Sequence, residues 1–182
     1  EKVTVRDASG HSEEYDEVIF ACHANQALEM IEDASMDERE ILEAFQYQNN
    51  RIVVHGDTNF MPKRRGAWAS WVYLSDVPDD KTPSVSLSYW MNNLQNLGTD
   101  SPVIVTLNPA REPSAGLVYD DHNFSHPVFT GRTYKAQQKI DDIQGVNKYW
   151  FCGAYQRYGF HEDGLLSTVR MLKKMGVDIP WV

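Results

Sequence analysis

Residues 149–155 read YWFCGAY, and residues 159–166 read GFHEDGLL. The first run stays apolar and aromatic until Gly153, which is typical of a buried strand that ends at a glycine turn. The second run predicts the start of a helix, with Glu162 and Asp163 in the first turn, where carboxylates complement the helix dipole. A strand, a glycine turn and a helix N-terminus together present backbone N–H groups to an anionic or electron-rich ligand. We therefore expect the rest of the chain to form a platform around this turn.

The composition is that of a folded globular protein. The chain has 182 residues, of which 42% are hydrophobic and 12% aromatic, enough for a substantial core. Its net charge of −9 argues against general affinity for nucleic acid, which depends on neutralising phosphates with Lys and Arg. The one basic cluster, residues 63–65, is short enough to be a solvated turn. No apolar run approaches the roughly 20 residues of a membrane helix, so we expect a cytoplasmic protein without an integral membrane segment.

The two cysteines, Cys22 and Cys152, each end an apolar run, and we expect buried reduced thiols. A nucleophilic pair of Cys22 with His23 is disfavoured, because neighbouring residues of a strand point to opposite faces.

The order of expected elements indicates an α+β fold with a mixed, mainly antiparallel sheet and flanking helices. The first strand is expected over residues 2–7, in a hairpin whose second strand is the apolar run 18–22. Further strands are expected over 51–55, 67–74, 84–89 and 103–107, and an edge strand within 108–122. Helices are expected over 23–31, after the capping residue Ser35, over part of 90–97, from Thr130 or Thr133 to 143, and over 162–174.

Two segments resemble a known family. Residues 14–24, EYDEVIFACHA, and 150–164, WFCGAYQRYGFHEDG, are similar to two flavin motifs of the flavin-containing amine oxidoreductases and the phytoene-desaturase-like enzymes. In that family the first motif returns to the nucleotide fold beside the flavin, and the second starts a helix that faces its pyrimidine edge. Residues 66–71, 89–92 and 126–129 resemble a bacterial subgroup described as predicted NAD/FAD-binding proteins.

The resemblance implies a domain organisation. Residues 1–24 and 146–182 would be returning segments of an FAD-binding domain, and residues 25–145 would be the substrate-binding domain. The family's N-terminal dinucleotide-binding half, with its G-x-G-x-x-G turn, is absent from these 182 residues. We therefore expect a fragment of an FAD-dependent oxidoreductase that is inactive alone, with an exposed apolar face through which a homo-oligomer could form.

The resemblance also implies cofactor contacts from three turns of the chain. These residues are Ala21, Cys22, His23, Gly153, Ala154, Tyr155, Gly159, Glu162, Asp163 and Gly164. The family usually has an acidic residue directly after the strand glycine, where this chain has Ala154. The alternative interpretation is an ordinary strand-to-loop turn, with Glu162 and Asp163 serving only to cap the helix.

Three residues are candidate catalytic groups. Phe160 occupies the position where amine oxidases often place a Tyr beside the substrate, and His161 is a candidate polar contact or proton relay. Arg51 begins a strand that aligns with one carrying a lysine in amine oxidases; the alternative is a surface arginine. Because Phe160 and Arg51 depart from the amine-oxidase pattern, an apolar acyl or isoprenoid chain is as good a substrate candidate as an amine.

The middle of the chain is rich in aromatic residues, which could line an apolar substrate channel or simply form the core. They are Trp68, Trp71, Tyr73, Tyr89 and Trp90. His122 and His126 have the i, i+4 spacing of helical metal ligands, but Asn123 and Pro127 argue against a helix there, so no metal site is expected.

The implied reaction is removal of a hydride from a small-molecule substrate to FAD. The alternative is a non-enzymatic module that binds a ligand or partner on its aromatic sheet.

Overall fold

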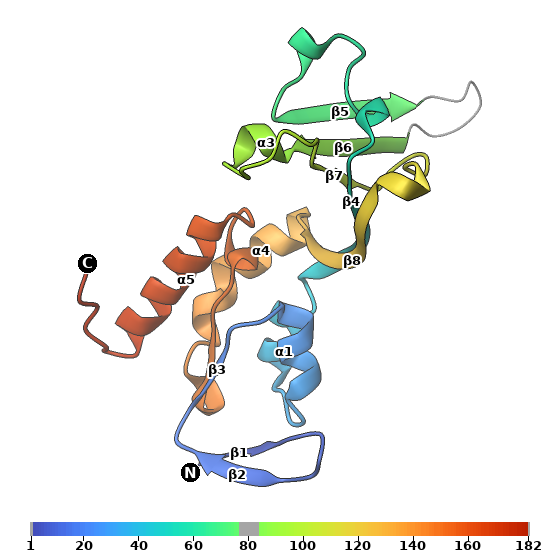
Figure 1. Cartoon of the computed structure of the whole chain (residues 1–182). Helices are drawn as coiled ribbons and strands as arrows, with labels where there is room; N and C mark the ends of the chain where they lie inside the picture. Colours follow the sequence, from blue (N-terminus) through green and yellow to red (C-terminus); the bar gives the residue numbers. More distant parts are fainter. Residues whose placement is uncertain (1, 77–83, 182) are drawn as a thin grey trace. The chain divides into compact units, whose positions relative to one another are not determined.

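The computed structural model describes residues 2–76 and 84–181. The chain forms two compact units: residues 1–48 with 127–182 are unit 1, and residues 49–126 are unit 2. Helices and a mainly antiparallel sheet confirm the α+β class (Figure 1). The prediction that an FAD-binding and a substrate-binding domain divide the chain concerns function and stays a prediction. Within the described residues, no helix is long and apolar enough to cross a membrane.

Unit 1 contains both ends of the chain. Its strands are β1 (Val3–Arg6), β2 (Ser12–Tyr15), β3 (Val18–Phe20) and β9 (Tyr149–Phe151). Its α-helices are α1 (Ala24–Met30), α2 (Met36–Leu42), α4 (Gly131–Lys139) and α5 (His161–Lys174). Short 3₁₀ turns include η4 (Ile140–Asp142), η5 (Val146–Lys148) and η6 (Ala154–Gln156).

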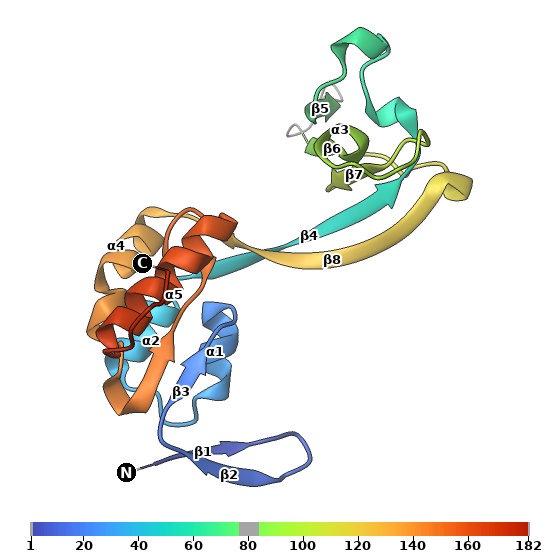
Figure 2. The same cartoon turned by 60° about the vertical axis from the view of Figure 1, so that its left-hand side comes forward.

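The hairpin prediction for the N-terminus was wrong in its second strand. β1 pairs antiparallel with the polar β2, from Val3 opposite Tyr15 to Arg6 opposite Ser12. The apolar β3 instead pairs in parallel with β9, 131 positions further along the chain, with Phe20 opposite Phe151 (Figure 2). The physical reason is burial: an apolar strand is stabilised between packed layers, whereas the alternating, exposed β1 pairs with an equally exposed partner.

The core of unit 1 lies between β3, β9 and the helices α1, α2 and α4. Its fully buried members include Leu42 and Phe151, and Phe20 stacks on Phe151 with ring centroids 5.3 Å apart. The predicted capping box of α2 is confirmed: the Glu38 N–H donates to Ser35 Oγ, and the Ser35 N–H donates to Glu38 Oε2. Thr130 caps α4 by accepting from the Thr133 N–H.

Unit 2 is built on a five-stranded sheet in the order β5-β6-β7-β4-β8. The strands are β4 (Gln46–His55), β5 (Trp71–Asp76), β6 (Ser84–Trp90), β7 (Ile104–Leu107) and β8 (Val118–Val128). The short turns η1 (Thr58–Phe60), η2 (Arg65–Ala67) and η3 (Ala115–Leu117) and the helix α3 (Met91–Leu94) connect them. The pairs β5–β6, β6–β7 and β7–β4 are antiparallel. An edge strand was expected within 108–122; β8 is at the edge but begins only at Val118 and extends beyond that range to Val128.

The two faces of this sheet differ in chemistry. One face packs on the small core of Met61, Val72 and Ile104, and it also buries a polar group of Ser86, Ser88, Thr106 and His55. The opposite face carries two cross-strand rows that are apolar throughout and incompletely buried. The rows are Trp71, Tyr89, Val105 and Val54, and Tyr73, Leu87, Leu107 and Ile52.

Candidate functional site

The strands β3 and β9 end side by side, which brings the two flavin-like segments of the sequence together. The Cys152 N–H donates to the Phe20 carbonyl at 3.0 Å. A Cβ placed on Gly153 would stand 3.6 Å from the backbone oxygen of Cys22. Residues 21–23 therefore lie against the turn at residues 153–155, at the carboxyl ends of two parallel strands. Ligand sites in α/β sheets form at such strand ends.

Gly153 and Gly164 allow the turn and the last helix to approach closely. A Cβ on Gly153 would lie 2.6 Å from the Tyr155 ring, which leaves no room for a side chain. A Cβ on Gly164 would lie 3.8 Å from the backbone N of Ala154, in ordinary contact. The Gly153 N–H donates to Ser167 Oγ at 2.8 Å, which ties the turn to the second turn of α5.

Gly159 is needed where it stands for two reasons. Its φ of +88° lies in the left-handed region, and a Cβ there would be 3.3 Å from the Phe129 ring. The loop of residues 154–159 contains Tyr155 and Tyr158, and we call it the aromatic loop. The Gly159 N–H closes it by donating to the Ala154 carbonyl at 3.2 Å. The aromatic loop thus returns to the turn just before α5 begins.

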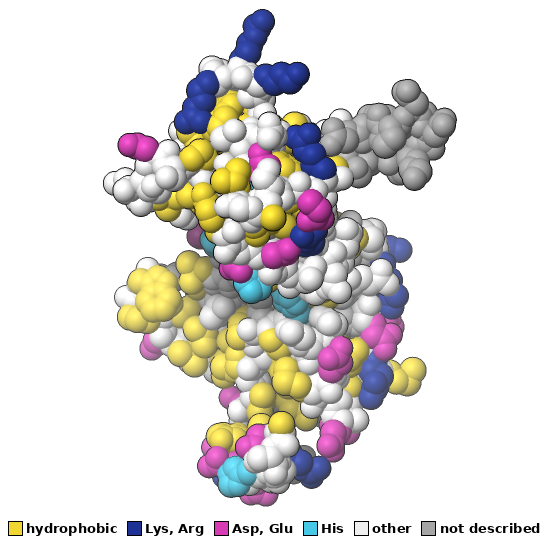
Figure 3. All heavy atoms as spheres, turned by 45° about the vertical axis from the view of Figure 1, so that its right-hand side comes forward, with side chains coloured by type: hydrophobic (Ala, Val, Ile, Leu, Met, Phe, Trp, Pro, Cys, Tyr) yellow, Lys and Arg dark blue, Asp and Glu magenta, His cyan; other side chains and the backbone are white. Residues whose placement is uncertain are grey.

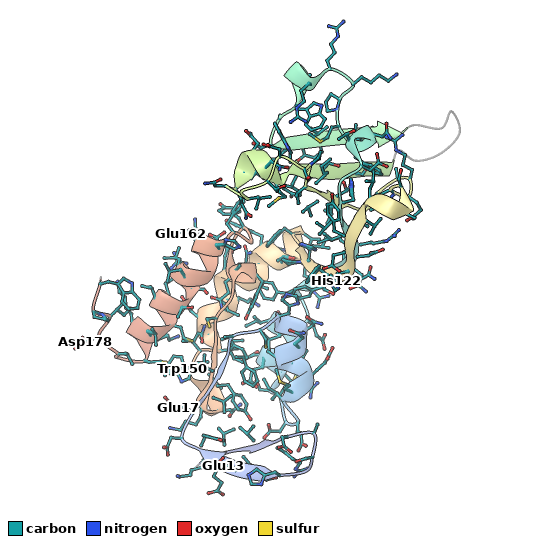
Figure 4. The ribbon with its side chains drawn as sticks, viewed as in Figure 1. Glu13, Glu17, His122, Trp150, Glu162 and Asp178 are labelled. Atoms are coloured by element: carbon teal, nitrogen blue, oxygen red, sulfur yellow. The ribbon has the colours of Figure 1, made fainter. Side chains whose placement is uncertain are left out.

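Asp163 caps α5 with its own carboxylate. Oδ2 accepts from the N–H groups of Phe160 at 3.1 Å and Tyr158 at 3.2 Å, and the side chain is only 4% exposed. Arg157 Nη1 lies 3.6 Å from Oδ1. The structure therefore gives Asp163 a local structural task, as the capping alternative proposed, while Glu162 is exposed at the start of α5 (Figure 4).

The start of α5 has free donors. Among the described residues, the N–H groups of His161 and Glu162 have no hydrogen-bond partner, as expected for the first turn of a helix. His161 is exposed, and Phe160 is 70% exposed. A close-approach turn of small residues beside free N–H groups fits a flavin ring edge, which presents carbonyl oxygen and ring nitrogen acceptors. Ala154 adds no polar side chain to this set.

The sequence did not point to Tyr47, which completes this end of the site. Its ring stacks on His23 with centroids 4.4 Å apart, and its hydroxyl accepts from the Ala24 N–H at 2.9 Å. Burial raises the pKa of Tyr47 to about 12. Tyr47 lies at the start of β4, four residues before the strand expected from residue 51. The run between them is polar, so the sequence did not indicate the longer strand.

The two cysteines are free and belong to different clusters. Cys22 packs with Phe20 and Phe151, whereas Cys152 is buried with Trp150 and Met171. Burial, and to a smaller extent the neighbouring Cys152, raise the pKa of the Cys22 thiol. A thiol with a raised pKa is a poor nucleophile at neutral pH.

Arg51 is held by two carboxylates of unit 2. Its guanidinium lies 2.6 Å from Glu112 Oε1 and 2.7 Å from Asp121 Oδ2. The hydrogen bonds to Glu112 and then Asp121 raise the pKa of Arg51 and lower that of both carboxylates. These contacts give Arg51 the role of a surface arginine in ion pairs, which was the alternative to a catalytic role.

The five predicted substrate-pocket aromatics do not form one cluster. Trp71 and Tyr73 are 60% and 72% exposed on the apolar face of the sheet, where Tyr89 is their cross-strand neighbour. Trp68 and Trp90 pack on the other face, edge to face at 5.2 Å. The alternation of β6 places Tyr89 and Trp90 on opposite faces, and Trp68 lies before β5, so a surface group of three is separate from a core pair.

His122 and His126 lie in the extended strand β8 (Figure 4), so their spacing does not place both on one helical face. His122 Nε2 contacts Asp120 at 2.9 Å, and His126 Nδ1 contacts Asn50 at 3.0 Å. In the described ranges, no group of three or more His, Cys, Asp or Glu side chains could hold a metal.

Comparison with known proteins identifies a solved structure of similar fold. No family model and no curated protein matches the chain. A solved structure described as a "CLA-producing fatty acid isomerase from P. acnes" is similar over 97% of this chain, with a TM-score of 0.63 and 16% identity. The match covers 45% of that chain, so the present chain spans about half its length. At this identity the likeness establishes a shared fold.

Proposed function

We propose that the chain is part of an FAD-dependent oxidoreductase that acts on an apolar, acyl- or isoprenoid-like substrate, with an amine as the second substrate class. The observation that carries the proposal is the Gly153 turn, packed against the start of α5 with the free N–H groups of His161 and Glu162. The resemblance of residues 14–24 and 150–164 to flavin motifs supports the same assignment.

The residues of the chain would have distinct tasks in this function. FAD, when bound, would supply the hydride-accepting chemistry. The N–H groups of His161 and Glu162 would donate to acceptors on the flavin edge, where the helix dipole favours negative charge. Gly153, Ala154 and Gly164 would allow the backbone to approach the cofactor.

The apolar face of the unit 2 sheet supports the substrate class. Trp71 and Tyr73 expose most of their surface there, beside six further apolar side chains in the two rows. Such a face binds a hydrocarbon chain by removing apolar area from water, at about 25 cal/mol per Å². The eight described side chains of these rows include no carboxylate to pair with a substrate ammonium group, which favours an acyl chain over an amine. The fatty acid isomerase of similar fold supports the same class.

FAD uptake by the protein tests the proposal. We expect the visible flavin absorbance to co-purify with, or be taken up by, the protein when its complete coding sequence is expressed. Gly153→Val should abolish uptake, whereas the matched exposed variant Gly116→Val should leave it unchanged. A folded protein that remains colourless with excess FAD would refute the proposal.

A long-chain unsaturated fatty acid tests the substrate class separately. We expect Trp71→Ala with Tyr73→Ala to weaken its binding by at least tenfold without changing FAD uptake. Tyr134→Ala, an equally exposed aromatic on α4, is the control and should have no effect. Tight fatty acid binding without any FAD uptake would instead favour the non-enzymatic binding module.

A further inference from the structure

The loop between β4 and β5 carries a cluster of cations in an otherwise acidic protein. Lys63, Arg64 and Arg65 are consecutive and exposed, and no acidic residue occurs from residue 58 to residue 75. Arg111 is exposed at the base of the same loop, where it donates to the Asn59 carbonyl and lies over the Phe60 ring. Figure 3 shows Lys and Arg side chains, in dark blue, projecting from the upper part of the view. We call these four residues the basic loop.

Among the residues that the structure describes, no carboxylate pairs with the basic loop. Within the described part of the chain, none of its four cations forms an ion pair. Glu112, next to Arg111 in sequence, is engaged by Arg51. Asp57, just before the loop, is buried and accepts from Ser114 and Asn59. The four positive charges are therefore available to an external anion.

The basic loop is also held in a fixed conformation. Trp68 Nε1 donates to the Pro62 carbonyl at 2.8 Å and closes the loop across Lys63, Arg64 and Arg65. The Arg65 guanidinium lies 3.8 Å over the Trp68 ring and 4.6 Å from the Trp90 ring. Stacking uses the face of the guanidinium and leaves its in-plane N–H donors free for phosphate oxygens.

Two exposed leucines lie in and after α3, the helix that is hydrogen-bonded to Ser70 at the end of the β4–β5 connection. Leu94 and Leu97, in and after α3, are 41% and 38% exposed. The adjoining Asn93 donates to Ser70 Oγ at 2.7 Å, and the Trp90 N–H donates to the Ser70 carbonyl, so α3 is joined to the end of the loop. Cations next to exposed aliphatic side chains are the chemistry of a bilayer interface.

We propose that the basic loop with Leu94 and Leu97 docks the protein on an anionic phospholipid surface. The net charge of −9 disfavours binding of an extended polyanion such as nucleic acid, because the polyanion would also contact the acidic remainder of the protein. A bilayer surface, in contrast, can be contacted by one loop alone. The choice of a lipid also rests on the proposed function, because an acyl or isoprenoid substrate resides in membranes.

Vesicle co-sedimentation tests the proposal with the purified protein. We expect binding to phosphatidylglycerol vesicles and little binding to phosphatidylcholine vesicles. Salt at about 0.5 M should release the protein, because it shortens the electrostatic screening length to slightly more than about 3 Å. Lys63→Gln with Arg64→Gln should lower the partition coefficient about 30-fold, since each cation near an anionic surface contributes about fivefold. Arg65 is left intact in this variant because it packs on the tryptophans.

The matched control removes the same two charges elsewhere. Arg132→Gln with Lys135→Gln, both exposed on α4 and without an ion pair among the described residues, should bind vesicles as the unmodified protein does. Equal binding to both lipids, or equal losses in the two double variants, would overturn the proposal. Vesicle binding tests the docking proposal and FAD uptake tests the proposed function, so failure of one is distinguishable from failure of the other.

Discussion

Gly153 and Gly164 lie on either side of one contact, yet the space around them differs. A Cβ on Gly153 would overlap the Tyr155 ring at 2.6 Å, whereas one on Gly164 would make ordinary contacts at 3.8 Å and 3.9 Å. We predict that Gly153→Ala lowers the free energy of unfolding by about 2 kcal/mol through overpacking. Gly164→Ala should raise it by up to about 1 kcal/mol, because alanine is the better helix former.

Urea denaturation of the two alanine variants measures this difference. If Gly164→Ala is stabilised but takes up FAD less well, the space beside Ala154 serves the ligand rather than the fold. Equal stability of both variants would contradict the distinction drawn from the two contact distances.

His55 makes the stability of unit 2 depend on pH. It is fully buried: Nδ1 accepts from the Asp57 N–H at 3.1 Å, so Nε2 carries the proton and donates to Thr106 Oγ1 at 2.8 Å. Burial lowers the pKa of His55, which outweighs the opposite effect of Asp57. The unfolded chain therefore binds a proton before the folded one does as pH falls below about 6.5.

We predict that the free energy of unfolding is greatest above pH 6.5 and falls, by up to about 1.4 kcal/mol per pH unit, until the folded pKa is reached. His55→Asn should flatten this slope, while His11→Gln, in the exposed hairpin turn, should leave it unchanged. Denaturation curves at pH 5, 6, 7 and 8 provide the measurement, chosen to span roughly the histidine range. An unchanged slope in His55→Asn would show that other groups control the acid sensitivity.

At the scale of elements, α5 depends on its cap. The buried Asp163 carboxylate accepts two backbone N–H groups ahead of the helix, those of Tyr158 and Phe160. We predict that Asp163→Ala lowers the free energy of unfolding by about 2 kcal/mol, near the upper end for a lost cap. Glu162→Ala, which removes an exposed carboxylate from the same turn, should change it by less than about 0.5 kcal/mol.

Hydrogen exchange along α5 reports the local effect of these variants. Protection should fall first in residues 161–165 of Asp163→Ala, because the helix frays from its uncapped end. A uniform loss of protection over unit 1 would instead mean that Asp163 acts through the core.

At the scale of the whole molecule, each unit has buried clusters of its own, so damage to one unit should leave the other folded. Leu42 is fully buried in unit 1, and Ile104 is fully buried in unit 2. We predict that Leu42→Ala, at about 2–5 kcal/mol, reduces amide protection in residues 1–48 and 127–182 but not in 49–126. Ile104→Ala should show the reverse pattern. Equal losses in both units for either variant would show that the chain unfolds as one cooperative body.

Local sequence signals determined a large part of this protein. The run that ends at Gly153, the acidic first turn of α5, the Ser35–Glu38 capping box and the alternation of β5 each formed as expected, because each depends on residues a few positions apart. The separation of Trp71 and Tyr73 from Val72 follows from the same period of two.

Tertiary structure alone decided the long-range pairings. The sequence favoured a hairpin between residues 2–7 and 18–22, but strand pairing depends on which apolar surface is buried. β3 pairs with the largely buried β9, whereas β1 is mostly exposed and pairs with β2. Tyr47 stacks on His23, and Arg51 forms ion pairs with Glu112 and Asp121. These partners are far apart in the sequence, so no local pattern predicts their contact. The turn at Gly153 was evident in the sequence; which residues face it was fixed by the packing of β3, β9 and α5.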